Sequence, residues 1–163
     1  MSPKSVTRTV SWPARQMFDL VADIESYPEF LPWCVGARIE NRRPDGEREV
    51  LDSELVLSFK AFRESYRSRV ILDPDNLTID VSNLEGFFRK LDSQWRFVPD
   101  GDGCEVRFFI DFEFRSFLLR KTVGIAFNMA MQRVIHAFED RARSLHVQDK
   151  RSVAENGRPE AFS

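Results

Sequence analysis

The chain has 163 residues, which suits a single domain, because a second core would lack enough apolar side chains. Its formal net charge of −2 gives no overall attraction to nucleic acid, so DNA is not expected as a partner. The composition is unusual in its fifteen Phe residues, which indicate a thick core or a cavity lined with aromatic rings. Cys34 and Cys104 are isolated, which predicts free thiols in a reducing compartment and no metal site.

The first predicted element is a weakly alternating strand over residues 4–10. A short helix follows, with Ser11 as its expected cap, Pro13 in its first turn and Phe18 on its buried side. Pro28 and Pro32 interrupt the helical segment, because a residue before proline is pushed out of the helical region. The N-terminal residues lack the apolar run that a secretory signal would have, and no stretch is apolar enough to span a bilayer. We therefore expect a cytoplasmic protein that contacts the inner face of a membrane only from the side.

Six further strand-like segments follow, each with apolar side chains in alternation. The last is the clearest, because alternate residues from Val106 to Phe114 are apolar while most of their neighbours are charged. Short turn sequences rich in Pro, Asp and Gly separate the segments, which predicts hairpins and hence an antiparallel sheet.

From about residue 116 to residue 145 the apolar period becomes helical. Thirty helical residues extend about 45 Å, too far to stand alone in a small domain, so the helix must lie across the inner face of the sheet. Its apolar stripe contains Phe127, Met131 (or Ala130), Val134, Phe138 and Ala142. Residues 147–163 are polar and are predicted to form a disordered tail, which leaves residues 1–146 as the folded domain.

The segment Asp23–Cys34 is similar to the signature segment of the coenzyme Q-binding branch of the START superfamily, which includes polyketide cyclases. The strand around Tyr66 and the helical run Ala137–Ala142 resemble later segments of the same branch, and the similarity covers residues 3–146. The resemblance implies an α+β helix-grip fold: a curved, seven-stranded antiparallel sheet around a long C-terminal helix, with two short helices after the first strand. It also implies non-enzymatic binding of a polyprenyl quinone such as ubiquinone, in support of cellular respiration.

Candidate ligand-binding residues are those expected to face the space between sheet and helix. Tyr66 and Ser68 share one strand face, where their hydroxyls would orient a quinone head group; alternatively they belong to a hydrogen-bonded part of the core or an exposed strand end. Phe30 and Trp33 line the pocket entrance or, equally, pack the two short helices together. The predicted set is Phe30, Trp33, Tyr66, Ser68, Trp95, Phe112, Phe114, Phe127 and Met131.

Three links between elements join aromatic or leucine residues to paired basic residues: 59–63, 86–90 and 115–121. In an antiparallel meander these links share one end of the sheet, whereas the links at the opposite end carry no aromatic residue. We expect this end to dock on an anionic membrane surface. Alternatively, its Phe rings fold back over the cavity as a lid. The predicted docking residues are Phe62, Phe87, Phe88, Arg89, Lys90, Leu118, Arg120 and Lys121.

No catalytic residue is predicted, because the chain has no nucleophile or phosphate-loop motif, and neither His136 nor His146 has an evident orienting partner. No cofactor is expected apart from a bound lipid such as ubiquinone. Bacterial relatives in this branch include ribosome-association toxins, so binding to a ribosomal subunit is an open alternative. An aromatase or cyclase is the third alternative, since helix-grip folds host such enzymes.

Overall fold

The computed structural model describes the backbone of residues 3–59 and 61–156, and their side chains except those of residues 122–128 and 146–156. Strand β1 (Lys4–Val10) is followed by α1 (Ala14–Ala22) and the 3-10 helix η1 (Ile24–Glu29). The next strands are β2 (Cys34–Asp45), β3 (Arg48–Phe59), β4 (Phe62–Asp73), β5 (Thr78–Gly86), β6 (Phe88–Asp100) and β7 (Gly103–Phe114). The last element is α2 (Phe117–Asn156).

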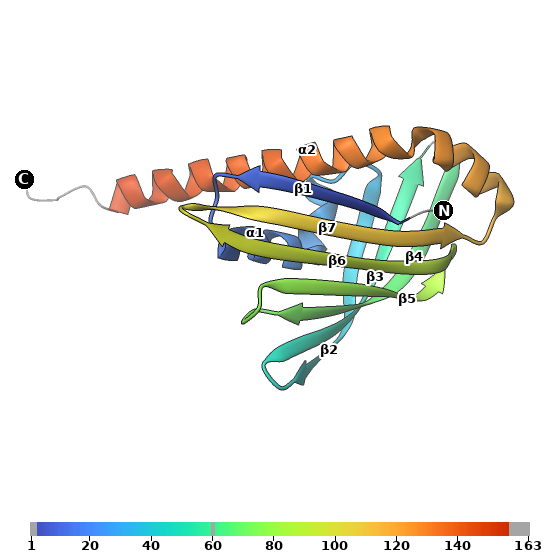
Figure 1. The fold of residues 1–163 in the computed structure, drawn as a ribbon, viewed down its shortest axis with the longest axis horizontal. Coiled ribbons are helices and arrows are strands. Elements are labelled where there is room, and N and C mark those ends of the chain that lie inside the picture. The colour runs from blue at the N-terminus through green and yellow to red at the C-terminus, as the bar shows by residue number, and fades with distance from the viewer. Residues whose placement is uncertain (1–2, 60, 157–163) are drawn as a thin grey trace, which may run out of the picture.

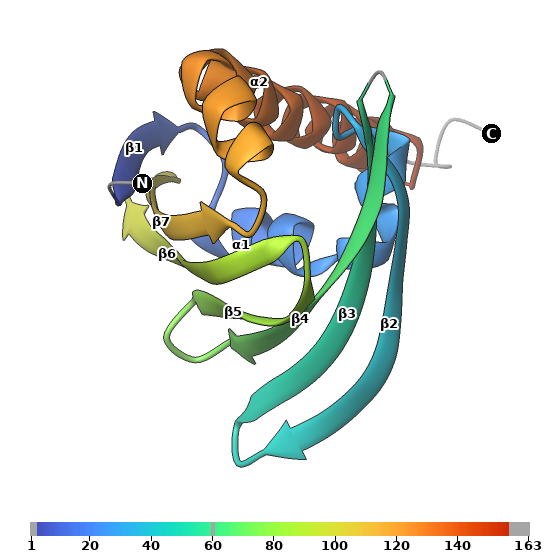
Figure 2. The ribbon, with the colours of Figure 1, turned by 90° about the vertical axis from the view of Figure 1, so that its right-hand side faces the viewer.

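The strands form one seven-stranded sheet in the order β1-β7-β6-β5-β4-β3-β2, and every neighbouring pair is antiparallel. From β2 to β7 each strand pairs with the next in sequence, and β1 then adds to the free side of β7. The sheet is strongly curved, and α2 passes over its concave side (Figures 1 and 2). The predicted helix-grip fold is confirmed.

The short helices fill one end of the concave side. Helix α1 begins directly after Pro13, whose extended backbone (ψ 149°) cannot itself be helical, and no side chain caps it. The predicted cap at Ser11 is therefore wrong. The buried side of α1 presents Met17, Phe18 and Val21 to the sheet, and the ring of Phe18 meets that of Phe97 edge-on at 6.1 Å.

Helix α2 contacts the core through part of the predicted stripe. Phe138 and Ala142 are buried, and Val134 and Leu145 pack against the same core. Phe127 belongs to the side chains outside the described set. The helix continues to Asn156, so residues 147–156, predicted as part of a tail, are helical, and in Figure 1 the helix extends past the ends of the strands. Within the described residues, no helix has the length and apolar character needed to cross a membrane.

The apolar interior is divided into two clusters. The larger lies between α1, the middle of α2 and one half of the sheet, and Leu51 and Ile79 are buried in it. The smaller cluster, at the end of the sheet where α2 begins, contains Phe88, Leu91, Phe112 and Phe114. Burying one such aromatic side chain stabilises the fold by about 1.5–3 kcal/mol, so both clusters contribute to its stability.

Candidate ligand-binding site

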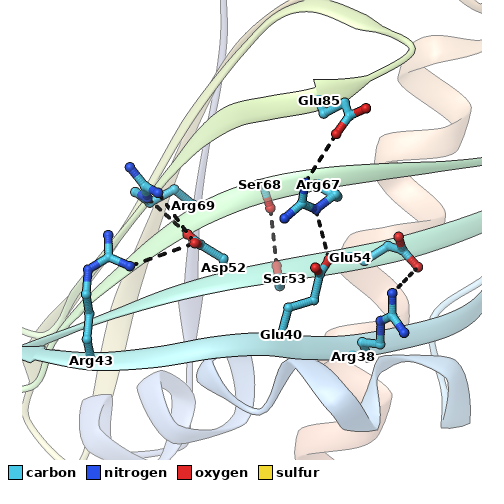
Figure 3. A network of polar contacts seen from close by, with 10 residues as sticks. All are labelled: Arg38, Glu40, Arg43, Asp52, Ser53, Glu54, Arg67, Ser68, Arg69 and Glu85. Atoms are coloured by element: carbon cyan, nitrogen blue, oxygen red, sulfur yellow. Dashed lines mark hydrogen bonds and ion pairs between the residues drawn. The ribbon is translucent and has the colours of Figure 1, made fainter.

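The two faces of strands β3 and β4 differ in chemistry because successive side chains point to opposite sides of a strand. Ser53 and Ser68 are directly paired and buried on the inner face, which confirms the predicted direction of Ser68. Their neighbours Asp52 and Arg69 are paired on the outer face, where the guanidinium Nε lies 3.0 Å from the carboxylate. Figure 3 shows the two serines on neighbouring strands, with ion-paired residues of the same strands around them.

The charges around Asp52 and Arg67 on the outer face neutralise one another. Arg69 donates two hydrogen bonds to Asp52, and these hold the pKa of that carboxyl below its ordinary value. Arg67 bridges Glu40 at 2.9 Å and Glu85 at 3.2 Å (Figure 3). Because these guanidinium groups already have carboxylate partners, this face offers little attraction to a phosphate or to nucleic acid.

A row of polar groups crosses the inner face. The hydroxyl oxygens of Ser53 and Ser68 lie 3.3 Å apart, and Asn83 on β5 is paired with Ser68. The Asn83 amide nitrogen donates to the carbonyl of Phe88 at 3.3 Å, which leaves its side-chain oxygen Oδ1 facing elsewhere. That oxygen is buried and has no hydrogen-bond partner in the described part of the chain. A buried acceptor of this kind costs free energy unless a donor, such as a ligand hydroxyl, reaches it.

Tyr66 lies beside this row, two residues from Ser68 on the same face of β4. Its ring packs edge-on against Phe87 at 5.4 Å and Phe88 at 5.1 Å. Burial raises the pKa of Tyr66 above its ordinary value, and the Cys34 thiol adds to the increase. The phenol therefore stays protonated at neutral pH and is a hydrogen-bond donor within an apolar surrounding.

The smaller cluster also contains two of the rings that the sequence predicted on the surface. Phe88 is 8% exposed and stacks on Phe114 at 5.2 Å, while Phe87 lies between Phe88 and Phe62. The expected exposure of Phe88 is therefore wrong, whereas Phe62 and Phe87 are half-buried, and the docking role of this end stays a prediction.

A small hollow of about 60 Å³ lies between α2 and strands β1 and β7. Two of the predicted residues, Trp95 and Met131, line it, together with Phe108 and Phe138, and the ion pair of Arg8 with Glu139 (2.8 Å) stands at its side. The rings of Trp95 and Phe138 lie 5.4 Å apart. Pockets for small molecules usually measure roughly 300–1,000 Å³, so a ligand needs more room than this hollow provides.

The two residues predicted at the pocket entrance separate in the structure. Phe30 packs against Tyr27 at 6.0 Å and Phe138 at 5.4 Å, so it joins η1 to α2. Trp33, with a left-handed backbone (φ 65°), packs against Phe59 at 5.8 Å at the tip of β3. Phe30 is thus part of the packing of the short helices, and Trp33 lies nearer to the end of the sheet.

A larger groove lies elsewhere, at a place that no residue pattern predicted. It measures about 510 Å³ and runs between α1 and the β2–β3 hairpin, over a floor that includes Phe18 and Leu72. Two ion pairs lie within its lining, Arg15 with Asp19 at 3.3 Å and Arg42 with Glu49. Only the folded hairpin brings these residues next to α1, so no local sequence pattern signals the groove.

The three basic links meet at one end of the sheet, as predicted. The backbone amide of Arg115 donates to the carbonyl of Phe87 at 3.0 Å, and its guanidinium donates to the carbonyl of Gly86 at the same distance. The β3–β4 tip joins them through the contact between Phe62 and Phe87. This surface is termed the basic end; its exposed or partly exposed members are Phe59, Arg63, Arg89, Arg115, Phe117, Leu118, Arg120 and Lys121.

A curved sheet that grips one long helix over an aromatic inner face with few polar groups defines the helix-grip class of ligand-binding domains. Residues 10–139 match the family described as polyketide cyclase / dehydrase and lipid transport. The chain belongs to this family, and its predicted membership of the START-like group is confirmed.

Several known proteins are similar over most of the chain. It is 42% identical over 142 residues to the ribosome association toxin RatA of Rickettsia prowazekii, which covers 85% of this chain and 94% of the relative. It is 27% identical over 146 residues to the coenzyme Q-binding protein COQ10 homolog B of Xenopus laevis, which covers 87% of this chain and 58% of the relative.

Two solved structures share the fold. The solution structure of an 18 kDa protein from Caulobacter crescentus has a TM-score of 0.76 and 40% identity, covering 90% of this chain and 99% of that one. A START superfamily protein from Mycobacterium smegmatis has a TM-score of 0.74 at 22% identity, covering 88% and 98% of the two chains. The second likeness shows the fold alone.

Proposed function

We propose that the protein binds a polyprenyl quinone or its quinol between the sheet and α2, without converting it chemically, and so supports respiratory electron transport. The observation that carries the proposal is the buried Asn83 Oδ1, which lacks a partner among the described residues and stands beside Ser68 on a mostly apolar inner face. The name of the Xenopus laevis relative, a coenzyme Q-binding protein, supports the same ligand class.

The polar groups of the inner face suit both redox states of such a ligand. The Tyr66 hydroxyl would donate a hydrogen bond to a quinone carbonyl, and Asn83 Oδ1 would accept one from a quinol hydroxyl. The aromatic rings around them, among them Phe88 and Phe112, would pack against the ring and the first isoprene units. A few polar groups in an apolar surrounding can orient a ligand, whereas general acid–base catalysis also requires a positioned acid–base pair.

The hollow of about 60 Å³ beneath the middle of α2 is smaller than a quinone ring with its tail, so binding requires the first turns of α2 to move away from the sheet. The Arg8–Glu139 ion pair and the packing of Phe138 hold the middle of the helix in place. We expect the helix to pivot about this point while its first turns lift from the smaller aromatic cluster.

Organic extraction of the purified protein, followed by mass spectrometry, tests the proposal. A quinone or quinol in stoichiometric amount is the expected result. If no isoprenoid lipid is found, and a short-chain ubiquinone added to the delipidated protein neither quenches Trp fluorescence nor raises the melting temperature, the quinone proposal is overturned.

A second candidate function is association with a ribosomal subunit. The observation in its favour is the 42% identity to a relative named a ribosome association toxin, and the 32% identity to a relative of the same name from Escherichia coli strain K12. Co-sedimentation with purified subunits at low and high salt tests it. Salt-sensitive binding of the lipid-free protein would support this function, and absence of binding at low salt would exclude it.

A further inference from the structure

The basic end combines exposed apolar side chains with cations that lack carboxylate partners. Phe117 and Leu118, in the first turn of α2, are 74% and 72% exposed. Such exposure is costly for large apolar residues, and two in succession beside basic residues are typical of a surface that meets an apolar partner. Ser116 fixes their direction, because its hydroxyl accepts the amide of Leu119 at 3.4 Å and so starts the helix there.

The cations of this end are only partly neutralised. Arg63, Arg115 and Lys121 are exposed and form no ion pair with any carboxylate in the described residues. Arg89 and Arg120 share Glu113, at 3.7 Å and 3.1 Å. Lys90 differs, because Asp111 pairs with it at 2.7 Å, so it adds little to the positive potential.

The opposite end of the sheet has the reverse character. Its turns carry the exposed carboxylates of Asp75, Asp100 and Asp102, and none of these forms an ion pair in the described part of the chain. The protein is therefore polarised along its strands although its net charge is only −2. A negatively charged surface would attract the basic end and repel the acidic turns, so approach would occur in one orientation.

We propose that the basic end docks on an anionic lipid bilayer, with Phe117 and Leu118 inserted at the interface and the surrounding Arg and Lys side chains against the lipid phosphates. The apolar pair favours a bilayer over RNA, because a leucine beside the phenylalanine gains free energy in hydrocarbon but has no base to stack on. This orientation places the start of α2, and the smaller aromatic cluster behind it, next to the membrane. The proposal goes beyond ligand binding and does not depend on it.

Flotation with phosphatidylcholine vesicles, with and without phosphatidylglycerol, tests the docking surface. The wild-type protein is expected to float only with the anionic vesicles and to be released as the salt concentration rises. Replacement of both apolar residues, Phe117→Asp with Leu118→Asp, should abolish flotation. The matched control is Met129→Asp, which changes a 66% exposed side chain farther along the same helix and should float like wild type.

Two variants with the same change in net charge distinguish an effect of the basic end from an effect of overall charge. Lys121→Glu should weaken vesicle binding more than about fivefold, the factor expected for loss of one basic residue at an anionic surface. Arg96→Glu alters the net charge equally, at an exposed arginine on the outer face of β6 that forms no ion pair with the described residues, and should bind almost like wild type. Circular dichroism must show that all variants are folded.

Two outcomes would overturn the proposal. The first is equal flotation of the wild-type protein and the Phe117→Asp, Leu118→Asp variant with anionic vesicles. The second is binding to ribosomal RNA, but not to vesicles, that is lost in Lys121→Glu and retained in the double variant, which would assign the basic end to RNA. Neither outcome bears on quinone extraction, so the two proposals fail separately.

Discussion

The hydroxyl oxygens of Ser53 and Ser68 lie 3.3 Å apart on the buried inner face of the sheet. One residue away along each strand, Asp52 and Arg69 form an ion pair on the outer face. The register of β3 against β4 therefore places the neutral pair inside and the charged pair outside. A slip of one residue would bring the charges into the interior, so these two pairs together specify the register.

The buried serine pair should behave as a unit. Ser53→Ala or Ser68→Ala alone leaves one buried hydroxyl without its partner and should lower the free energy of unfolding by about 1–2 kcal/mol. The double variant removes both hydroxyls and should cost less than the sum of the single changes. Urea denaturation of the four proteins measures this coupling. Strict additivity would show that the two hydroxyls do not interact.

The Asp52–Arg69 pair should give stability that depends on pH. Because Arg69 lowers the pKa of Asp52 in the folded state, the contribution is complete above the unfolded pKa of about 3.9 and disappears as pH falls through the folded pKa. At neutral pH, Asp52→Asn should therefore destabilise the protein by about 1 kcal/mol. Below that range the difference in melting temperature between variant and wild type should vanish. A constant difference from neutral to strongly acidic pH would contradict the assignment.

Phe88 and Phe117 should respond differently to truncation, although both lie near the same end of the sheet. Phe88 is 8% exposed and contacts four other rings, so Phe88→Ala should cost about 3–5 kcal/mol. Phe117 is 74% exposed, and Phe117→Ala should change stability by no more than about 0.5 kcal/mol. Guanidinium denaturation compares the two. Similar costs would mean that Phe88 is not packed as the structure has it.

Tyr66→Phe should separate ligand binding from folding. Loss of one hydrogen bond to a quinone carbonyl should weaken affinity by roughly threefold to tenfold, with little change in the melting temperature of the lipid-free protein. Tyr27→Phe is the matched control, because that hydroxyl donates to the carbonyl of Val21 within the short helices. It should lower stability and leave quinone affinity unchanged. Equal affinities for both variants would remove Tyr66 from the site.

Gly86 should be far less tolerant of substitution than Gly46. A Cβ on Gly86 would lie 2.6 Å from Cβ and 2.8 Å from Cα of Tyr66, and its φ of 134° is a glycine conformation. Gly86→Ala should therefore cost at least about 3 kcal/mol, against about 1 kcal/mol for Gly46→Ala, which has a left-handed φ but open space around it. Thermal unfolding of the two variants checks the difference.

Alternation of apolar side chains was enough to predict the strands and their buried faces, because a strand with one buried face has a strict period of two. Ser68 and Phe112 lie on the predicted side for this reason. The same argument fails at Phe87 and Phe88. Only Phe87 separates β5 from β6, Gly86 takes a positive φ, and the register shifts between Phe88 and Lys90. These irregularities turn the rings inward, and alternation carries no information about them.

Features that depend on contacts between distant elements were not accessible from the sequence. The last turns of α2 contain no apolar stripe, so their helical state had no periodic signal. The unpartnered oxygen of Asn83 follows from the direction of its amide toward Phe88, five residues later, across the β5–β6 link. Of the predicted site residues, Phe30 and Trp95 pack against the larger cluster, whereas Tyr66, Phe112 and Phe114 lie in or against the smaller one.

The pairing of β1 with β7 joins residues from opposite ends of the domain, Lys4 with Ile110 and Val10 with Cys104. On the ribosome, the first strand therefore emerges long before its partner and has no edge on which to add until β7 has been synthesised. Closing so long a loop makes folding slow compared with local hairpin formation. A nascent chain that ends within β6 would expose both an unpaired strand edge and the apolar inner face, so chaperone binding or aggregation is a greater hazard during translation than after it.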